Sequence, residues 1–120
     1  MPMRLNHFNL TVTDVPAAAT FLATYFGMHD QGGNAGMTLL TDGPGFNGMI
    51  LTLMKAKAGG FGGYPETFHI GFFTGDRAEV DALSARLRRD GYDAGGPKDT
   101  GHSYGFYVKA PGGFVVEVGA

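Results

Sequence analysis

The chain has 120 residues, of which 43% are hydrophobic and 17% charged, and its formal net charge is −2. This is the composition of an ordinary folded protein, and the length suits one domain that buries roughly two thirds of its unfolded surface. The scattered Lys and Arg give no basic patch for nucleic acid, and a chain without cysteine forms neither disulfides nor thiolate metal sites. No apolar run is long enough to span a membrane and the first residues do not resemble a signal peptide, so a cytoplasmic protein is expected.

The segment His7–Asp14, HFNLTVTD, returns in the second half as HIGFFTGD at His69–Asp76. In each copy a histidine opens an alternating, strand-like run and an aspartate closes it. Side chains alternate across a strand, so each histidine lies on the face that its apolar neighbours avoid. The sequence therefore predicts a duplicated module that brings two histidines together.

The first half is expected to contain a strand, a helix and two further strands, over Leu5–Thr13, Val15–Phe26, Met37–Thr41 and Met49–Met54. Asp14 is a good N-cap for the helix, and Gly27 offers a C-cap. The glycine-containing stretch after the helix, which includes His29, is expected to be a loop.

A glycine-rich segment, Ala56–Glu66 (AKAGGFGGYPE), is expected to link two repeats of about residues 1–56 and 66–120 within a single domain, 1–120. It lacks the G-x-x-x-x-G-K-[ST] pattern of a phosphate-binding loop. The second half repeats the order of the first, with elements expected over Thr67–Thr74, Arg77–Arg89, Tyr92–Ala94, Tyr104–Lys109 and Phe114–Val118. His102 lies in the loop before the final hairpin.

If the apolar faces of these strands pack on the helices, polar side chains gather on the other face, namely His7, Asn9, His69, Tyr107 and Glu117. Two imidazoles and one carboxylate make a metal ligand set with open positions for substrate or solvent. A glutamate flanked by valines is costly unless a cation or a hydroxyl lies beside it.

Each of these residues also has a simpler interpretation. A lone histidine is more often a structural residue than a metal ligand, and we interpret His29 and His102 in this way first. Glu117 could instead pair with Lys109 or with an arginine at a strand edge. The matched positions of the histidines in the two repeats favour the metal site.

The segments LNHFNLTVTDVPAAATFLATYFG, FHIGFFTGD and FYVKAPGGFVVEV resemble the vicinal oxygen chelate superfamily over nearly the whole chain. That group includes glyoxalase I, extradiol dioxygenases, fosfomycin-resistance transferases and bleomycin-binding proteins. The resemblance implies an α+β fold in which two βαβββ modules form a cupped, mostly antiparallel eight-stranded sheet, with the helices on its outer face. It also implies a homodimer.

The resemblance implies one divalent metal ion (Fe, Mn, Zn or Ni) held by His7, His69 and Glu117. Tyr107 falls on the tyrosine that often supports the glutamate ligand. The position of a fourth ligand in glyoxalase I falls on Thr52, which places this chain closer to the members with three ligands.

The implied function is that of a metal-dependent enzyme acting on a small oxygen-chelating substrate, as a lyase, thiol transferase or dioxygenase. Tyr107 and His102 are then the expected catalytic groups. The residues expected to contact the substrate are Asn9, Thr52, Phe61 and Tyr64. The alternative is a non-catalytic drug-binding protein of the bleomycin-resistance type, with a pocket lined by Phe61, Tyr64, Met49 or Met54.

Overall fold

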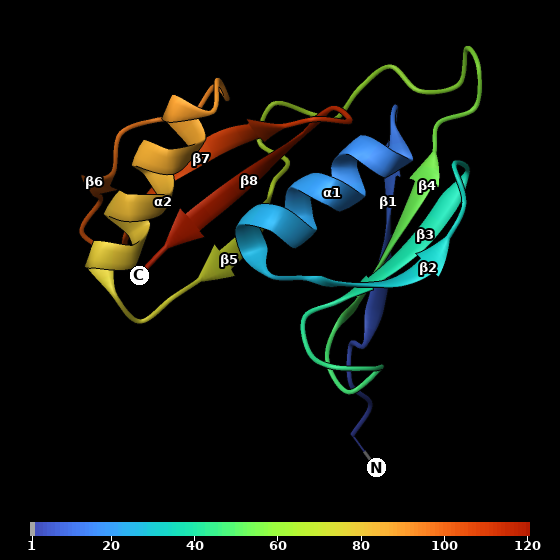
Figure 1. Ribbon diagram of the computed structural model, residues 1–120, viewed down its shortest axis with the longest axis horizontal. Helices are drawn as coiled ribbons and strands as arrows, with labels where there is room; N and C mark the ends of the chain where they lie inside the picture. The colour runs from blue at the N-terminus through green and yellow to red at the C-terminus, as the bar shows by residue number, and fades with distance from the viewer. Residues whose placement is uncertain (1) are drawn as a thin grey trace. The chain divides into compact units, whose positions relative to one another are not determined.

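The computed structural model describes residues 2–120. The chain divides into two compact units, Met1–Gly62 and Gly63–Ala120, and the boundary lies within the glycine-rich segment expected to link the repeats. Over the described residues, each unit contains one helix and one four-stranded sheet (Figure 1).

The first unit consists of β1 (His7–Val12), α1 (Val15–Phe26), β2 (His29–Gly33), β3 (Met37–Thr41) and β4 (Ile50–Lys55). Its sheet has the order β1-β4-β3-β2, in which only the β1–β4 pair is parallel. The expected caps are present. The Asp14 carboxylate accepts the N–H of Ala17 at 3.0 Å, and the helix ends at Gly27, whose φ of 66° is in the left-handed region that glycine tolerates.

The second unit consists of β5 (Ile70–Phe73), α2 (Arg77–Arg89), β6 (Lys98–Asp99), β7 (Tyr104–Ala110) and β8 (Phe114–Gly119). Its order, β5-β8-β7-β6 with β5 and β8 parallel, repeats that of the first unit. Asp76 caps α2 by accepting the N–H of Ala78 at 2.8 Å. The prediction of an α+β fold built from two βαβββ modules, with mostly antiparallel strands, is confirmed.

Each helix covers one face of the sheet in its own unit. In the first unit the buried apolar side chains come from α1 and from alternate strand positions, among them Leu10, Val12, Phe21, Leu22, Leu40, Leu51 and Leu53. In the second unit the corresponding set includes Val80, Leu87, Phe106, Val108, Val116 and Val118. The period of two is thus satisfied on both sheets, and each unit leaves the opposite face of its sheet for other side chains.

Three local predictions are wrong. In the loop expected before the final hairpin, Lys98–Asp99 forms the short strand β6. His29–Gly33 forms the edge strand β2 and not a loop, although all five of its residues are exposed. Residues HDQGG show no apolar alternation, and the strand is defined by its pairing with β3. Conversely, the strand expected at Tyr92–Ala94 is reduced to a single bridge between Ala94 and Val108.

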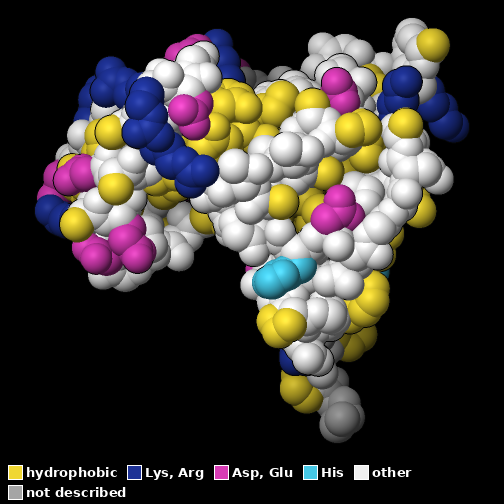
Figure 2. Space-filling view, in the orientation of Figure 1, with side chains coloured by type: hydrophobic (Ala, Val, Ile, Leu, Met, Phe, Trp, Pro, Cys, Tyr) yellow, Lys and Arg dark blue, Asp and Glu magenta, His cyan; other side chains and the backbone are white. Residues whose placement is uncertain are grey.

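The surface of the second unit is strongly charged over its helix. Figure 2 shows Lys and Arg side chains gathered over α2, whose last turn contains Arg86, Arg88 and Arg89. Cations at this end of a helix interact favourably with the helix dipole. Neither helix found in residues 2–120 has the length and apolarity needed to cross a membrane.

Candidate functional site

A row of three paired residues crosses the second sheet on the face that α2 does not cover. Glu117 on β8 lies opposite Gly71 on β5 and opposite Tyr107 on β7. Paired residues on neighbouring strands point to the same face. His69, two residues before Gly71, points to that face as well, because its ring contacts Tyr107 edge-on with 5.4 Å between centroids.

His69 and Glu117 are close enough to bind one metal ion. Nε2 of His69 lies 3.9 Å from Oε2 of Glu117, and the two side chains are 39% and 24% exposed. Metal–ligand bonds of about 2.1 Å allow two ligand atoms of one ion to be at most about 4.2 Å apart. The second unit therefore supplies two of the three predicted ligands, and over its described residues no third His, Asp or Glu completes a group of three.

A backbone carbonyl fixes the tautomer of His69. Its Nδ1 lies 3.0 Å from the carbonyl oxygen of Thr67, and since that oxygen only accepts, Nδ1 is the protonated nitrogen. The Nε2 lone pair is then free and directed to the side of the ring where Glu117 lies. This is the arrangement in which an imidazole binds a metal ion.

Tyr107 supports the carboxylate of Glu117. The tyrosine hydroxyl donates a hydrogen bond to Glu117, and this bond, together with partial burial and the carboxylate charge, raises the pKa of Tyr107 above its usual value of 10.0. Tyr107 therefore keeps its proton at neutral pH. The predicted alternative, an ion pair between Glu117 and Lys109, is not what the structure contains, because Lys109 pairs with Asp93 at 3.4 Å.

The first unit presents the other predicted polar residues on the equivalent face. His7 and Asn9 are exposed on β1, and Asn9 lies opposite Thr52 of β4. Nδ1 of His7 lies 2.7 Å from Oδ1 of Asn6, an oxygen that accepts, so the proton again lies on Nδ1 and Nε2 is free. Both histidines of the repeat thus have the same tautomer, one fixed by a side chain and the other by the backbone.

A hollow of about 360 Å³ lies beside His69 in the second unit. Its lining comes from the turn before β5 and from β7 and β8, and consists of Glu66, Thr67, Phe68, His69, Tyr107 and Val115. Tyr64 stacks on Phe68 with ring centroids 4.2 Å apart. This volume is within the range of small-molecule sites, and it places aromatic rings next to the predicted metal ligand.

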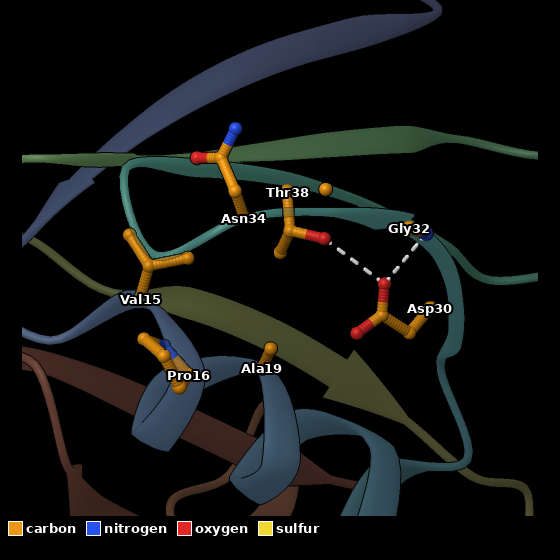
Figure 3. Close-up of a pocket in the computed structure, with 8 residues that line it drawn as sticks. Val15, Pro16, Ala19, Asp30, Gly32, Asn34 and Thr38 are labelled. Carbon is orange, nitrogen blue, oxygen red and sulfur yellow. Dashed lines mark hydrogen bonds between the residues drawn. The ribbon is translucent and has the colours of Figure 1, made fainter.

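A second hollow, of about 300 Å³, lies in the first unit between the start of α1 and the β2–β3 hairpin (Figure 3). Its polar groups are engaged within the hairpin. Oδ1 of Asp30 accepts the Thr38 hydroxyl at 2.9 Å and the Gly32 N–H at 2.8 Å. Oδ1 of Asn34 accepts the N–H of Met37 at 3.1 Å. These contacts shape the edge strand β2, and no predicted site residue lines this hollow.

Tyr64 adjoins the hollow by stacking on Phe68, whereas His102 lies outside this arrangement. His102 is exposed in a bend between β6 and β7, and it takes part in none of the hydrogen bonds or ring contacts among the described residues. Phe61 belongs to the first unit and Tyr64 to the second. The roles proposed for these residues stay predictions.

Three residues near the site were not singled out by the sequence pattern: Asn6, Glu66 and Phe68. Asn6 precedes His7, and a polar side chain next to a candidate ligand is a signal that could have identified it. Glu66 and Phe68 lie at the end of the glycine-rich segment. Only the turn at residues 66–67 brings them to the hollow.

Comparisons with known proteins agree with this architecture. Residues 4–118 match the family model described as Glyoxalase/Bleomycin resistance protein/Dioxygenase superfamily. A comparison with curated protein sequences gives no significant match.

Several solved structures have the same fold. A structure described as a possible glyoxalase from Bacillus cereus is 43% identical with a TM-score of 0.86, and the match covers 99% of this chain and 100% of that one. A lactoylglutathione lyase from Agrobacterium tumefaciens is 24% identical with a TM-score of 0.73, covering 98% and 93%. The fosfomycin resistance protein FosX from Mesorhizobium loti is 18% identical with a TM-score of 0.76, covering 100% and 93%. The last two show the fold alone.

Proposed function

The chain belongs to the Glyoxalase/Bleomycin resistance protein/Dioxygenase superfamily, and we propose that it is a divalent-metal-dependent enzyme whose small substrate binds through two neighbouring oxygen atoms. The observation that carries the proposal is the 3.9 Å approach of the His69 Nε2 to the Glu117 carboxylate, with Tyr107 donating to that carboxylate. The reaction is of the lyase, thiol-transferase or dioxygenase type. The lactoylglutathione lyase and FosX share the fold with this chain, and the support for this range of chemistry is the family match over residues 4–118.

One divalent ion, Fe, Mn, Zn or Ni, would be held by His7, His69 and Glu117. When bound, it would supply Lewis-acid chemistry or, for a redox-active metal, activation of O2. The support for His7 is its place in the repeat and its free Nε2, both of which match His69. The chain's own residues would orient the ligands, bind the substrate and transfer the proton.

In this proposal Tyr107 holds its proton on the hydroxyl and fixes the orientation of Glu117. His69 keeps its proton on Nδ1, directed at the Thr67 carbonyl, which prevents the ring from turning. Asn9 hydrogen-bonds a substrate oxygen through its amide, with Thr52 beside it. His102 transfers a proton, because imidazole is the side chain best suited to proton transfer at neutral pH.

Metal analysis of the purified chain is the decisive test. We expect about one divalent ion per chain as isolated, lost in His7→Ala, His69→Ala and Glu117→Gln while circular dichroism shows an intact fold. His29→Ala, a change at an exposed histidine on β2, is the matched control and should keep the ion. Unchanged metal content in both His69→Ala and Glu117→Gln would contradict the ligand assignment. A screen of catechols, 2-oxoaldehyde–thiol adducts and fosfomycin with a thiol then defines the reaction.

A non-catalytic drug-binding function is the second candidate, and the stacked pair of Tyr64 and Phe68 beside the hollow supports it. Such a protein would bind an aromatic drug such as bleomycin equally well with and without chelator. Binding of that kind, with no turnover in the screen, would favour this candidate over the enzyme.

We also propose that the protein is a cytoplasmic homodimer. Within each unit the sheet face opposite the helix has no covering layer of its own, and an assembly of two chains would protect such faces. Light scattering at micromolar concentration should give twice the chain mass, whereas a monomer would contradict the assembly.

A further inference from the structure

An exposed aromatic residue lies next to the Glu117 row on the uncovered face of the second sheet. Phe73 on β5 pairs with Gly119 on β8, and Gly119 pairs with Gly105 on β7. These three residues are two positions along their strands from the row that contains Glu117 and Tyr107, so they lie on the same face, roughly 7 Å away. Phe73 is 71% exposed there.

Glycines give the Phe73 ring its place on the sheet. A Cβ added at Gly119 would lie 2.6 Å from Cε1 and 3.1 Å from Cδ1 of Phe73, so the ring reaches over β8 into the space of a missing side chain. Gly119 is buried, as expected of a residue beneath a ring, and its carbonyl accepts the Thr74 N–H at 2.9 Å. A Cβ at Gly105 would overlap the Val118 carbonyl, so only glycine fits there and the surface beside the ring stays open.

The first unit also has exposed apolar side chains at this register. Its matching row places Met54 opposite Met37, and these methionines are 40% and 41% exposed. On both sheets, apolar side chains are thus presented one row beyond the predicted polar site residues, and apolar surface left exposed in this way marks an interaction site. Methionine side chains are flexible, whereas the Phe73 ring offers a rigid surface in a fixed position.

We propose that Phe73 is a specificity-determining residue, which stacks on a flat apolar group of the substrate, such as an aromatic ring, while two oxygens of the same molecule bind the ion at His69 and Glu117. Aromatic rings prefer such stacked or tilted contacts with one another. The inference rests on the proposed function, because it assigns the substrate class of the same site. A ring bonded directly to the chelating group spans the distance of one row.

The test compares three hydroxamates that present the same two oxygens and differ in the attached group: acetohydroxamate, cyclohexanecarbohydroxamate and benzohydroxamate. Calorimetry on the full chain as isolated should give about tenfold tighter binding of benzohydroxamate than of acetohydroxamate. The cyclohexyl compound should have an intermediate affinity, because its ring makes apolar contact but does not stack.

Variants of Phe73 test the residue itself. Phe73→Ala should remove the preference for benzohydroxamate and leave both the acetohydroxamate affinity and the metal content unchanged. Phe73→Tyr keeps the ring and should retain the preference. Phe46→Ala is the matched control, at a phenylalanine that is 59% exposed in the β3–β4 loop, and should retain it too.

A further variant displaces the ring without removing it. Gly119→Ala puts a methyl group where the Phe73 ring lies. The three atoms nearest to such a Cβ all belong to that ring, the third of them at 3.6 Å, so the backbone need not move. The preference for benzohydroxamate should fall several-fold, while circular dichroism shows an intact fold.

Equal binding of acetohydroxamate and benzohydroxamate, or a preference that persists in Phe73→Ala, would overturn the role of Phe73 while the metal site stands. Binding of neither compound would overturn the metal site and this inference with it. Light scattering separates a substrate contact from a contact with a second chain. Phe73→Ala should keep the mass of the wild type in solution, and a fall in mass would show that a second chain covers Phe73, which overturns the proposal.

Discussion

The two units have the same scaffold and different chemistry. Each has a histidine at or just before its first strand whose Nδ1 is hydrogen-bonded and whose Nε2 is free, and each has the same strand order. The rows that cross the two sheets at matching register positions differ completely. The first unit has Asn9, Thr52 and Leu39, whereas the second has Gly71, Glu117 and Tyr107.

The difference shows what a carboxylate in such a row needs. Beside Glu117 the structure places a hydroxyl donor, Tyr107, and a residue without a side chain, Gly71. A Cβ added at Gly71 would lie 4.0 Å from Oε1 of Glu117, which is an ordinary contact, so the hydroxyl of Tyr107 is the feature that distinguishes this row. Thr52, at the matching position of the first unit, instead lies between Leu39 and Asn9. A duplicated fold thus retains its packing in both halves and confines the carboxylate to one of them.

The largest expected effect concerns His102, which belongs to the second unit alone. On whichever substrate of the screen is turned over, His102→Ala should slow turnover by roughly 10²–10⁴-fold, the usual scale for a lost acid–base group. Its metal content should stay at the wild-type level, because an exposed side chain in the β6–β7 bend is not among the proposed ligands. A variant with the wild-type rate would reduce His102 to a surface residue.

The next effect concerns Tyr107, which distinguishes the two rows. Tyr107→Phe removes the hydroxyl that donates to Glu117 but keeps the ring, and should weaken metal affinity about 10–100-fold, the range for lost supporting contacts. Competition with a chelator measures it. Leu39→Val, at the matching position of the first unit, should leave the affinity unchanged. Equal losses in both variants would mean that packing, and not the hydroxyl, is responsible.

A smaller effect is expected from Asn6, which marks the difference between the two histidines. Removing its amide in Asn6→Ala frees Nδ1 of His7, whereas the backbone carbonyl of Thr67 continues to hold His69. Metal affinity should fall by roughly tenfold, the low end of the range. Nitrogen chemical shifts of the imidazoles should show mixed tautomers for His7 and a single one for His69. An unchanged His7 spectrum would contradict the role of Asn6.

Local alternation in the sequence was enough to predict both sheets and the common face of His69, Tyr107 and Glu117, because a period of two follows from the strand backbone itself. It could not predict β2, whose exposed polar and glycine residues show no apolar alternation and pair with β3 through the backbone and through polar side chains. It also could not show that the Thr67 carbonyl fixes the His69 tautomer, or that Glu66 lines the hollow. Those contacts depend on a turn whose conformation no periodic pattern encodes.

The smallest effect concerns the edge strands, which the two units anchor in different ways. In each, an aspartate Oδ1 accepts the N–H of the glycine two residues later: Asp30 with Gly32, and Asp99 with Gly101. Asp30 adds a neutral hydroxyl, from Thr38, whereas Asp99 adds a cation, Arg77 at 3.1 Å. Only the second edge strand is thus held in part by an ion pair, which depends on pH.

The Gly101 N–H, and after it Arg77, lower the pKa of Asp99 below its usual value of 3.8. The charged form is therefore favoured by folding, so its contribution to the free energy of unfolding is present above that value and is lost as the pH falls through the lowered pKa.

Asp99→Asn keeps an oxygen for the glycine but removes the charge. Its urea midpoint should lie slightly below that of the wild type at neutral pH, since an exposed pair contributes little, and the gap should close below about pH 3. A gap for Asp99→Asn that stays constant down to acid pH would show that the charge of Asp99 does not help to hold β6 in place.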